Sequence, residues 1–123
     1  MRAVKRVVVE PSGHRLLNHG DTAMLQVAVR RLRETWPDAS IGVITADADG
    51  LERHVPGVEP VPASGRYELI DDSAPLPSRR DRMLAAVQAV EGDVTAAERA
   101  LGVPLGESAR AYLGVLAGAD VFL

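Results

Sequence analysis

The strongest constraint on the fold of this 123-residue chain is a pair of short apolar runs separated by a helical pattern. Val4 to Glu10, with the sequence VKRVVVE, is rich in β-branched residues and is followed by proline, serine and glycine. This composition favours a buried parallel strand that ends in a turn. Ile41 to Ala46, IGVITA, has the same apolar character. A strand, a helix and a second strand form a βαβ unit, which predicts a parallel sheet with a right-handed crossover.

The helix between these strands is expected over residues 21–36. Asp21 lies in its first turn, where a carboxylate complements the unpaired amides, and Pro37 ends it. Arginines and a glutamate occupy the predicted polar face. The residues expected on the apolar face are Met24, Leu25, Val27, Ala28 and Leu32.

The rest of the chain continues the alternation of helices and strands. We expect a short helix at 51–54, a strand at 58–61, an irregular insertion at 62–78, helices at 82–90, 93–101 and 109–117, and a strand from 119. The prediction is therefore one Rossmann-like α/β domain over 1–123, a parallel sheet with flanking helices. The apolar residues 119–123 have no turn or polar tail after them, which predicts a chain truncated at its C-terminus.

Composition excludes several classes of function. Apolar residues make up 46% of the chain and charged residues 25%, as in ordinary soluble domains. Only 3% of residues are aromatic and the net charge is -3, which disfavours nucleic acid as a partner. No cysteine is present, which excludes disulfides and thiolate metal sites. Together with an N-terminus that lacks a signal-peptide core or a membrane span, this predicts a cytoplasmic protein.

The loop between the first strand and the first helix carries the candidate ligand-binding residues. Loops at the carboxyl ends of parallel strands are where open α/β sheets meet their ligands. Gly20 would let backbone approach a ligand, while Asn18 and Asp21 would hydrogen-bond to hydroxyl groups. The alternative is purely structural: Asn18 or Asp21 caps the helix and Gly20 supplies a positive φ angle.

Basic residues in the same loop extend this candidate site. His14 and His19 could contact a phosphate or donate a proton near neutral pH, and Arg15 could pair with a carboxylate or phosphate. The alternative is that these are solvated surface groups. His14, His19 and Asp21 lack the spacing of a metal site, so we predict no metal. Separately, we predict no cofactor, and we assign no catalytic residue to this chain.

Acidic residues also follow the second strand. A dinucleotide-binding domain places its ribose-binding acid near Asp47 and Asp49. The first strand, however, is not followed by the Gly-x-Gly-x-x-Gly turn that such domains need. We therefore interpret these two acids as turn residues.

Leu17 to Gln26, LNHGDTAMLQ, is the most specific segment of the chain. It resembles the opening of the polysaccharide pyruvyl transferase family, in which a strand leads through an Asn-x-Gly-Asp-x-Ala loop into an apolar helix and a strand ending near Asp. The matching positions here are Asn18, Gly20, Asp21 and Ala23. The final GADVFL is similar to the family's Ala-Asp-apolar strand, without the glycine-rich turn that normally follows. The resemblance covers residues 4–62 and 112–123.

This resemblance implies one half of a fold like that of the B-type glycosyltransferases, in which two Rossmann-like halves face each other. The family transfers a pyruvyl group from phosphoenolpyruvate to a sugar as a ketal, in exopolysaccharide or cell-wall glycan biosynthesis. Its donor-binding basic residues lie largely in the second half, so this amino-terminal half is expected to be inactive alone. The expected partners are a glycan acceptor and phosphoenolpyruvate, once a second domain completes the site.

Two alternatives remain open. The chain could be half of a B-type glycosyltransferase that uses a nucleotide sugar. It could instead be a non-catalytic remnant or interaction module that self-associates through its C-terminal strand, because an unpaired strand edge can pair with another chain.

Overall fold

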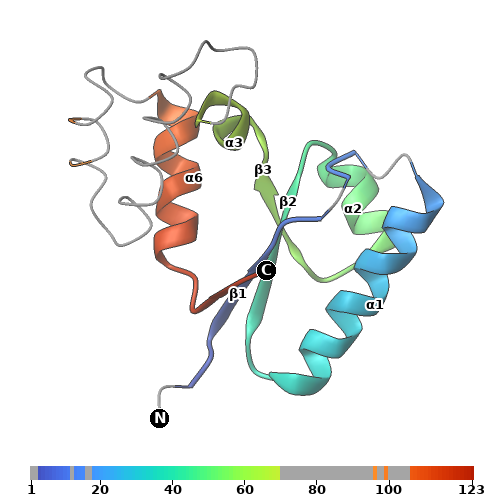
Figure 1. Cartoon of the computed structure of the whole chain (residues 1–123). Coiled ribbons are helices and arrows are strands. Elements are labelled where there is room, and N and C mark those ends of the chain that lie inside the picture. The colour runs from blue at the N-terminus through green and yellow to red at the C-terminus, as the bar shows by residue number, and fades with distance from the viewer. Residues whose placement is uncertain (1–2, 12, 16–17, 70–95, 97–98, 100–105) are drawn as a thin grey trace. The chain divides into compact units, whose positions relative to one another are not determined.

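The computed structural model describes residues 3–11, 13–15, 18–69, 96, 99 and 106–123. The chain divides into two compact units (Figure 1). The first comprises Met1–Pro62 together with Ala119–Leu123, and the second comprises Ala63–Gly118. All strands that the structure describes belong to the first unit, so the loop after the first strand lies there as well.

The first unit is built on a parallel sheet of four strands in the order β3-β2-β1-β4. In the register of the sheet, Val7 lies opposite Ile41 on one side and opposite Val121 on the other. This sheet and its helices confirm the predicted α/β, Rossmann-like fold. The strands are β1 (Arg6–Val9), β2 (Ser40–Thr45), β3 (Glu59–Pro62) and β4 (Val121–Phe122).

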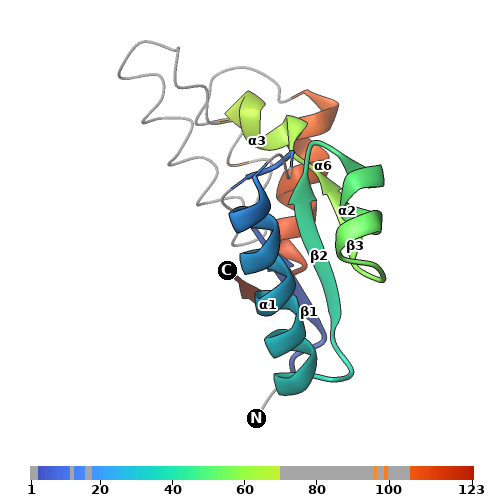
Figure 2. The same cartoon turned by 90° about the vertical axis from the view of Figure 1, so that its right-hand side faces the viewer.

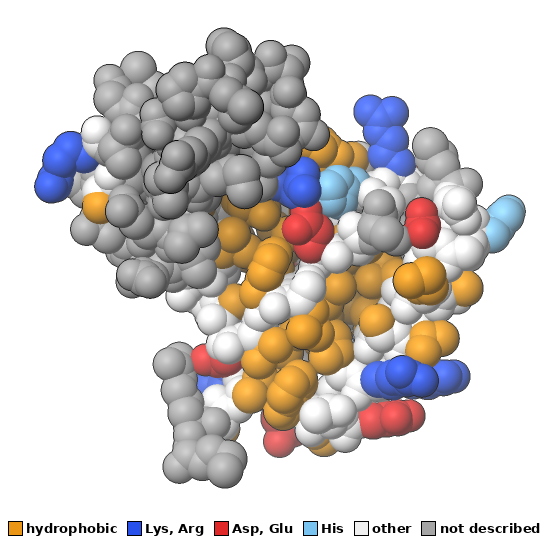
Figure 3. Space-filling view, in the orientation of Figure 1, with side chains coloured by type: hydrophobic (Ala, Val, Ile, Leu, Met, Phe, Trp, Pro, Cys, Tyr) orange, Lys and Arg blue, Asp and Glu red, His pale blue; other side chains and the backbone are white. Residues whose placement is uncertain are grey.

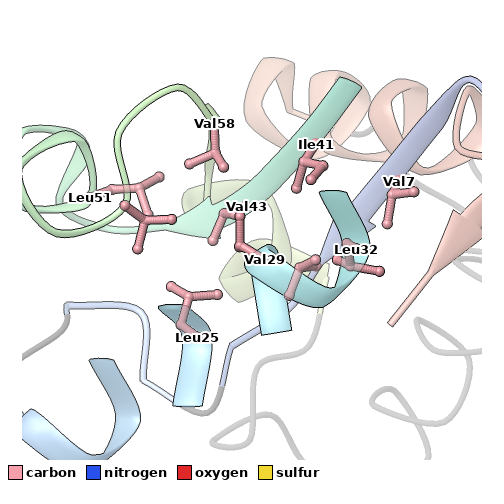
Figure 4. Close-up of a cluster of buried hydrophobic side chains, with 10 residues drawn as sticks. Val7, Leu25, Val29, Leu32, Ile41, Val43, Leu51 and Val58 are labelled. Atoms are coloured by element: carbon pink, nitrogen blue, oxygen red, sulfur yellow. The ribbon is translucent and has the colours of Figure 1, made fainter. Parts of the chain in front are cut away.

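Two helices follow β1 and β2 and pack on one face of the sheet. Helix α1 (His19–Thr35) runs antiparallel to β1 and β2 (Figures 1 and 2), and α2 (Ala48–His54) precedes β3. Burying one aliphatic side chain of this kind contributes about 1.5–3 kcal/mol. The buried cluster between these helices and the sheet (Figure 4) consists of Val7, Val9, Leu25, Val29, Leu32, Ile41, Val43, Leu51, Val55 and Val58.

The buried face of α1 differs from the predicted one. Leu25, Val29 and Leu32 are buried, whereas Met24 is 66% exposed and Val27 is 37% exposed. Positions 25, 29 and 32 are separated by four and three residues and so share one side of a helix. Each residue of an α-helix is rotated by about 100° from the one before it, so Met24 and Val27 point away from that side. The prediction that these two residues belong to the core was therefore wrong.

A charged pair crosses the other face of the sheet. The Arg6 Nη1 atom on β1 lies 2.6 Å from the Glu59 Oε2 atom on β3, with β2 between the two strands. The guanidinium passes over Gly42, where a Cβ atom would lie only 2.7 Å from Arg6 Nη2. Glycine at position 42 therefore gives this side chain room to cross the central strand.

Strand β4 is fastened to β1 by the side chain of the residue before it. The Asp120 Oδ2 atom accepts hydrogen bonds from the backbone amides of Lys5 (2.8 Å) and Arg6 (3.0 Å). In addition, the Asp120 amide donates to the Arg6 carbonyl (2.9 Å) and the Leu123 amide donates to the Val8 carbonyl (3.0 Å). The aspartate of the GADVFL segment thus has a structural role in holding the last strand in the sheet.

The second unit contains a close crossing of α3 (Ser64–Leu69) and α6 (Glu107–Ala117). A Cβ atom added to Gly65 would overlap the Ser108 carbonyl oxygen and lie 2.5 Å from the Tyr112 Cβ atom. The two helix backbones can approach this closely only because residue 65 has no side chain.

Helix α6 is capped at its N-terminus by α3. The Glu68 carboxylate accepts hydrogen bonds from the amides of Gly106 (2.8 Å) and Ala109 (3.2 Å). An acidic side chain is favoured at this end of a helix because the first amides have no intrahelical acceptor. Glu68 therefore supplies the cap that Gly106, the N-cap residue, has no side chain to provide.

Helix α6 and strand β4 confirm the elements predicted at 109–117 and from residue 119. Within the stretch predicted to be an irregular insertion, 62–78, residues 64–69 instead form α3, because packing against α6 stabilises a helix that has no apolar repeat of its own. Residues 70–78 and the predicted helix 82–90 lie outside the described residues, as does 93–101 apart from Ala96 and Arg99. In the part of the chain that the structure describes, no helix is long and apolar enough to cross a membrane.

Candidate functional site

The order of the strands identifies the edge of the sheet where a ligand is expected. After β1 the chain builds the sheet on one side, through β2 and β3, and then adds β4 on the other side of β1. Open parallel sheets bind ligands beyond the carboxyl ends of the strands at such a switch point. The loop that leaves β1, from Glu10 to Asn18, begins at this position. Acidic, basic and histidine side chains gather over this part of the first unit (Figure 3).

The bend at residues 18–21 forms the start of α1. Asn18 is the N-cap residue, with φ −105° and ψ 125°, and its Oδ1 atom accepts a hydrogen bond of 2.7 Å from the Gly20 amide. Its carbonyl accepts hydrogen bonds of 3.1 Å from the amide and the hydroxyl of Thr22. Asn18 therefore caps the helix, as the structural alternative predicted. The bend is nevertheless accessible, because Asn18, His19 and Gly20 are all exposed.

Gly20 does not provide a positive φ angle, so that part of the structural alternative was wrong. It lies within α1, and the positive-φ glycine among the described residues is Gly57, with φ 85°. A Cβ atom at position 20 would lie 3.1 Å from the Asn18 Oδ1 atom. The absence of a side chain at Gly20 thus leaves room for the side-chain oxygen of Asn18, which caps the helix.

Asp21 is half-buried and is directed back toward the loop. Its Oδ2 atom lies 3.0 Å from the position that a Cβ atom of Gly13 would occupy. A larger residue at position 13 would therefore press against this carboxylate. Asp21 therefore lies close to the loop at Gly13, in the first turn of α1, where its charge is favourable.

His14 is held close to Glu10 at the end of β1. The His14 Nε2 atom lies 3.5 Å from the Glu10 Oε1 atom, and the two side chains are 14% and 26% exposed. This pairing was not predicted from the sequence, because a spacing of four residues brings side chains together in a helix but not generally in a loop. By contrast, the structure leaves Arg15 and His19 exposed to solvent.

The backbone of His14 is tied to the neighbouring strand. Its carbonyl accepts hydrogen bonds from the Ala46 amide (2.9 Å) and from the Thr45 hydroxyl (3.1 Å) at the end of β2. Thr45 is only 5% exposed, and its Oγ1 atom also accepts a hydrogen bond of 3.0 Å from the Asp47 amide. Thr45 was not among the predicted site residues. The one signal in the sequence is a threonine that ends an apolar strand just before an aspartate.

Asp47 caps the next helix. Its Oδ1 atom accepts a hydrogen bond of 3.0 Å from the Gly50 amide at the start of α2. Asp47 therefore has a structural role at the end of β2, as predicted, whereas Asp49 lies in the first turn of α2 and its interpretation as a turn residue was wrong. Among the described residues, no group of three histidine, aspartate or glutamate side chains is arranged to hold a metal ion.

The structure thus places Asp21, in the first turn of α1, against the loop at Gly13, the residue before His14, and it places Asn18 at the N-cap of the same helix. Such a loop can present backbone amides and polar side chains to hydroxyl or anionic groups of a ligand. Comparison of the chain with models of protein families, with curated proteins and with solved structures finds no match. A proposal of function must therefore come from the residues themselves.

Proposed function

We propose that this chain is the amino-terminal, acceptor-side half of a polysaccharide pyruvyl transferase-like protein of the cytoplasm. The observation that carries the proposal is the exposed bend at Asn18–Gly20, which starts α1 at the carboxyl edge of a parallel sheet. The Asn-x-Gly-Asp-x-Ala segment that resembles the family forms this bend. It is therefore at the edge where α/β sheets bind ligands.

The reaction would join two hydroxyl oxygens of one sugar to carbon 2 of phosphoenolpyruvate. The bond from that carbon to the phosphate oxygen breaks, and inorganic phosphate leaves. Of the two hydroxyl protons, one goes to the methylene carbon, which becomes the methyl group of the ketal, and the other leaves with phosphate. In this scheme the bend and His14 contact the acceptor sugar, while phosphoenolpyruvate is bound by basic residues of a second domain.

The exposed groups of the loop suit an acceptor sugar. The Asn18 amide nitrogen can donate to a hydroxyl oxygen while its Oδ1 atom remains in the cap. Arg15 and His19 are also exposed and can hydrogen-bond to further hydroxyls. A sugar bound here would be recognised by several neutral or charge-assisted hydrogen bonds instead of by an apolar surface.

A pair of Asn18 variants separates the ligand role from the capping role. Aspartate caps helices about as well as asparagine, so Asn18→Asp retains the cap but removes the amide donor. Asn18→Ala removes both. Amide NMR spectra of the wild-type chain are recorded while neutral hexose and N-acetylhexosamine oligosaccharides are added. We expect saturable shifts at Gly20 and His19, and weaker binding to Asn18→Asp even though its α1 is as stable as that of the wild type.

Two results would contradict this proposal. If nucleotide sugars shift the bend amides and the oligosaccharides do not, the glycosyltransferase alternative gains support. If the chain alone transfers pyruvate from phosphoenolpyruvate to a glycan, measured as released phosphate and a heavier glycan, then the claim that it is half of an enzyme is wrong.

The interaction-module alternative is favoured by one observation. Phe122 and Leu123, at the end of β4, are 47% and 57% exposed, and β4 is an outer strand of the described sheet. Exposed apolar residues on an outer strand are a common means of pairing with another chain. Sizing at several protein concentrations tests this alternative, and a strictly monomeric chain would exclude self-association through β4.

A further inference from the structure

We propose that Thr45 is a positioning residue of the candidate site, which fixes His14 at the carboxyl edge of the sheet. The proposal extends the proposed function, because it takes the loop that carries His14 to face the ligand. The hydrogen bonds by which Thr45 positions the loop do not depend on which ligand binds.

The Thr45 hydroxyl lies between two loops. It donates to the His14 carbonyl at 3.1 Å, in the loop after β1, and accepts from the Asp47 amide at 3.0 Å, in the turn after β2. One hydroxyl therefore joins the loops that leave two neighbouring parallel strands. Valine has the same shape as threonine but can form neither bond.

The Thr45 side chain is also shielded from solvent. Thr45 is 5% exposed, so water has little access to the hydroxyl and cannot readily replace these partners. A buried polar group that loses its partner costs more than an exposed one. The loop is thus held in place by a bond that solvent does not easily exchange.

The hydrogen bond from Thr45 also fixes the backbone of His14. Its carbonyl is held by both the Thr45 hydroxyl and the Ala46 amide, while its imidazole is only 14% exposed beside Glu10. Fixing the backbone of a residue limits the directions in which its side chain can point. Removing the Thr45 hydroxyl should therefore free the loop and expose the imidazole more often.

The test is the rate at which diethyl pyrocarbonate modifies each histidine, read by mass spectrometry of peptides from the folded chain. The chain has 3 histidines, and His19 and His54 are both exposed and serve as internal standards. In Thr45→Val, modification of His14 should become roughly two- to tenfold faster relative to the standards, the range expected for loss of one hydrogen bond. Thr45→Ser, which retains the hydroxyl, should restore the wild-type rate.

Thr35→Val is a matched control. The Thr35 hydroxyl donates to the Arg31 carbonyl at 2.9 Å near the end of α1, far along the chain from the loop. This variant loses one threonine hydroxyl at an exposed position, so it controls for the substitution itself and should leave the His14 rate unchanged. Equal rates in Thr45→Val and the wild type would overturn the proposal. A parallel rise at all of the histidines would also overturn it, because that indicates general destabilisation.

A measurement on the wild-type chain covers the case in which Thr45→Val does not fold. Ala46 is an exposed residue, and its amide should still exchange slowly with deuterium because it donates to the His14 carbonyl. Rapid exchange there would show that the loop is not fixed to β2, and the proposal would fail. If oligosaccharides do not bind but these results hold, only the proposed function is wrong.

Discussion

Replacing Asp120 with alanine should destabilise the first unit more than its position beside a two-residue strand suggests. The carboxylate accepts hydrogen bonds from two consecutive amides, those of Lys5 at 2.8 Å and Arg6 at 3.0 Å. Hydrogen bonds to a charged group contribute about 1.5–3 kcal/mol each when they are buried. Because the Lys5 bond is exposed and Asp120 is half-buried, we expect a combined loss of about 2–4 kcal/mol for Asp120→Ala.

The loss can be measured through the single tryptophan of the chain. Trp36 packs against the same buried cluster as Val121, the first residue of β4, so its fluorescence reports unfolding of the first unit. With a urea m-value of about 2 kcal/mol/M, the unfolding midpoint should fall by about 1–2 M. Hydrogen exchange at the Leu123 amide, which donates to β1, should accelerate in parallel.

Two further variants make the experiment decisive. Asp120→Asn retains a side-chain oxygen acceptor without its charge, so its midpoint should lie between those of the wild type and Asp120→Ala. Asp38→Ala removes an exposed acid in the turn after α1 and should change the midpoint little. If Asp120→Ala unfolds at the same urea concentration as the wild type, the carboxylate does not hold β4 in the sheet, and the reasoning is wrong.

Two further predictions concern packing. Gly65→Ala should destabilise the second unit by about 1–3 kcal/mol, because the added Cβ atom overlaps α6 at the α3–α6 crossing. Gly114→Ala is the control and should be neutral or stabilising, because a Cβ atom there would meet nothing within 4 Å. Hydrogen exchange of the α6 amides compares the two variants, and equal exchange would contradict the close approach of the helices. Leu51→Ala, in a residue that is 1% exposed, should cost about 2–5 kcal/mol in thermal unfolding. Met24→Ala truncates a side chain that is 66% exposed, so the free energy of unfolding should hardly change. A loss as large as that of Leu51→Ala would contradict the exposed position of Met24.

The elements that were predicted correctly are those with a local signal. The β-branched run at Val7–Val9 and the run from Ile41 form β1 and β2, because strands buried on both faces are apolar throughout. The apolar spacing over residues 21–36 predicted α1, and it placed Leu25 and Leu32 correctly on the buried side. Met24 and Val27 were wrongly placed on the buried side. Each residue of a helix is rotated by about 100° from the one before it, so neither of them lies on the same side as Leu25.

What could not be predicted depends on contacts between distant residues. The segment that forms α3 has no apolar repeat, and its helix is stabilised by the crossing at Gly65 and by Glu68, which reaches α6 about forty positions further on. Asp120 likewise acts on amides at the other end of the chain. Similarly, Thr45 gains its importance only when the fold brings the loop at His14 to the end of β2. No local pattern contains this information.

The side chains of the Asn-x-Gly-Asp motif are used largely to build the bend. The Asn18 Oδ1 atom caps α1, Gly20 leaves space for that cap, and Asp21 lies close to the loop at Gly13. A motif that shapes a loop can be shared by proteins with different ligands, since most of its polar atoms are used in the bend. Under the proposed function, the Asn18 amide nitrogen is the group of the motif that meets the ligand. Selectivity among ligands then depends, in the same scheme, on exposed neighbours such as His19 and on the residues of the second domain. Specificity should consequently change with those neighbours while the motif, and the stability it confers, remains the same.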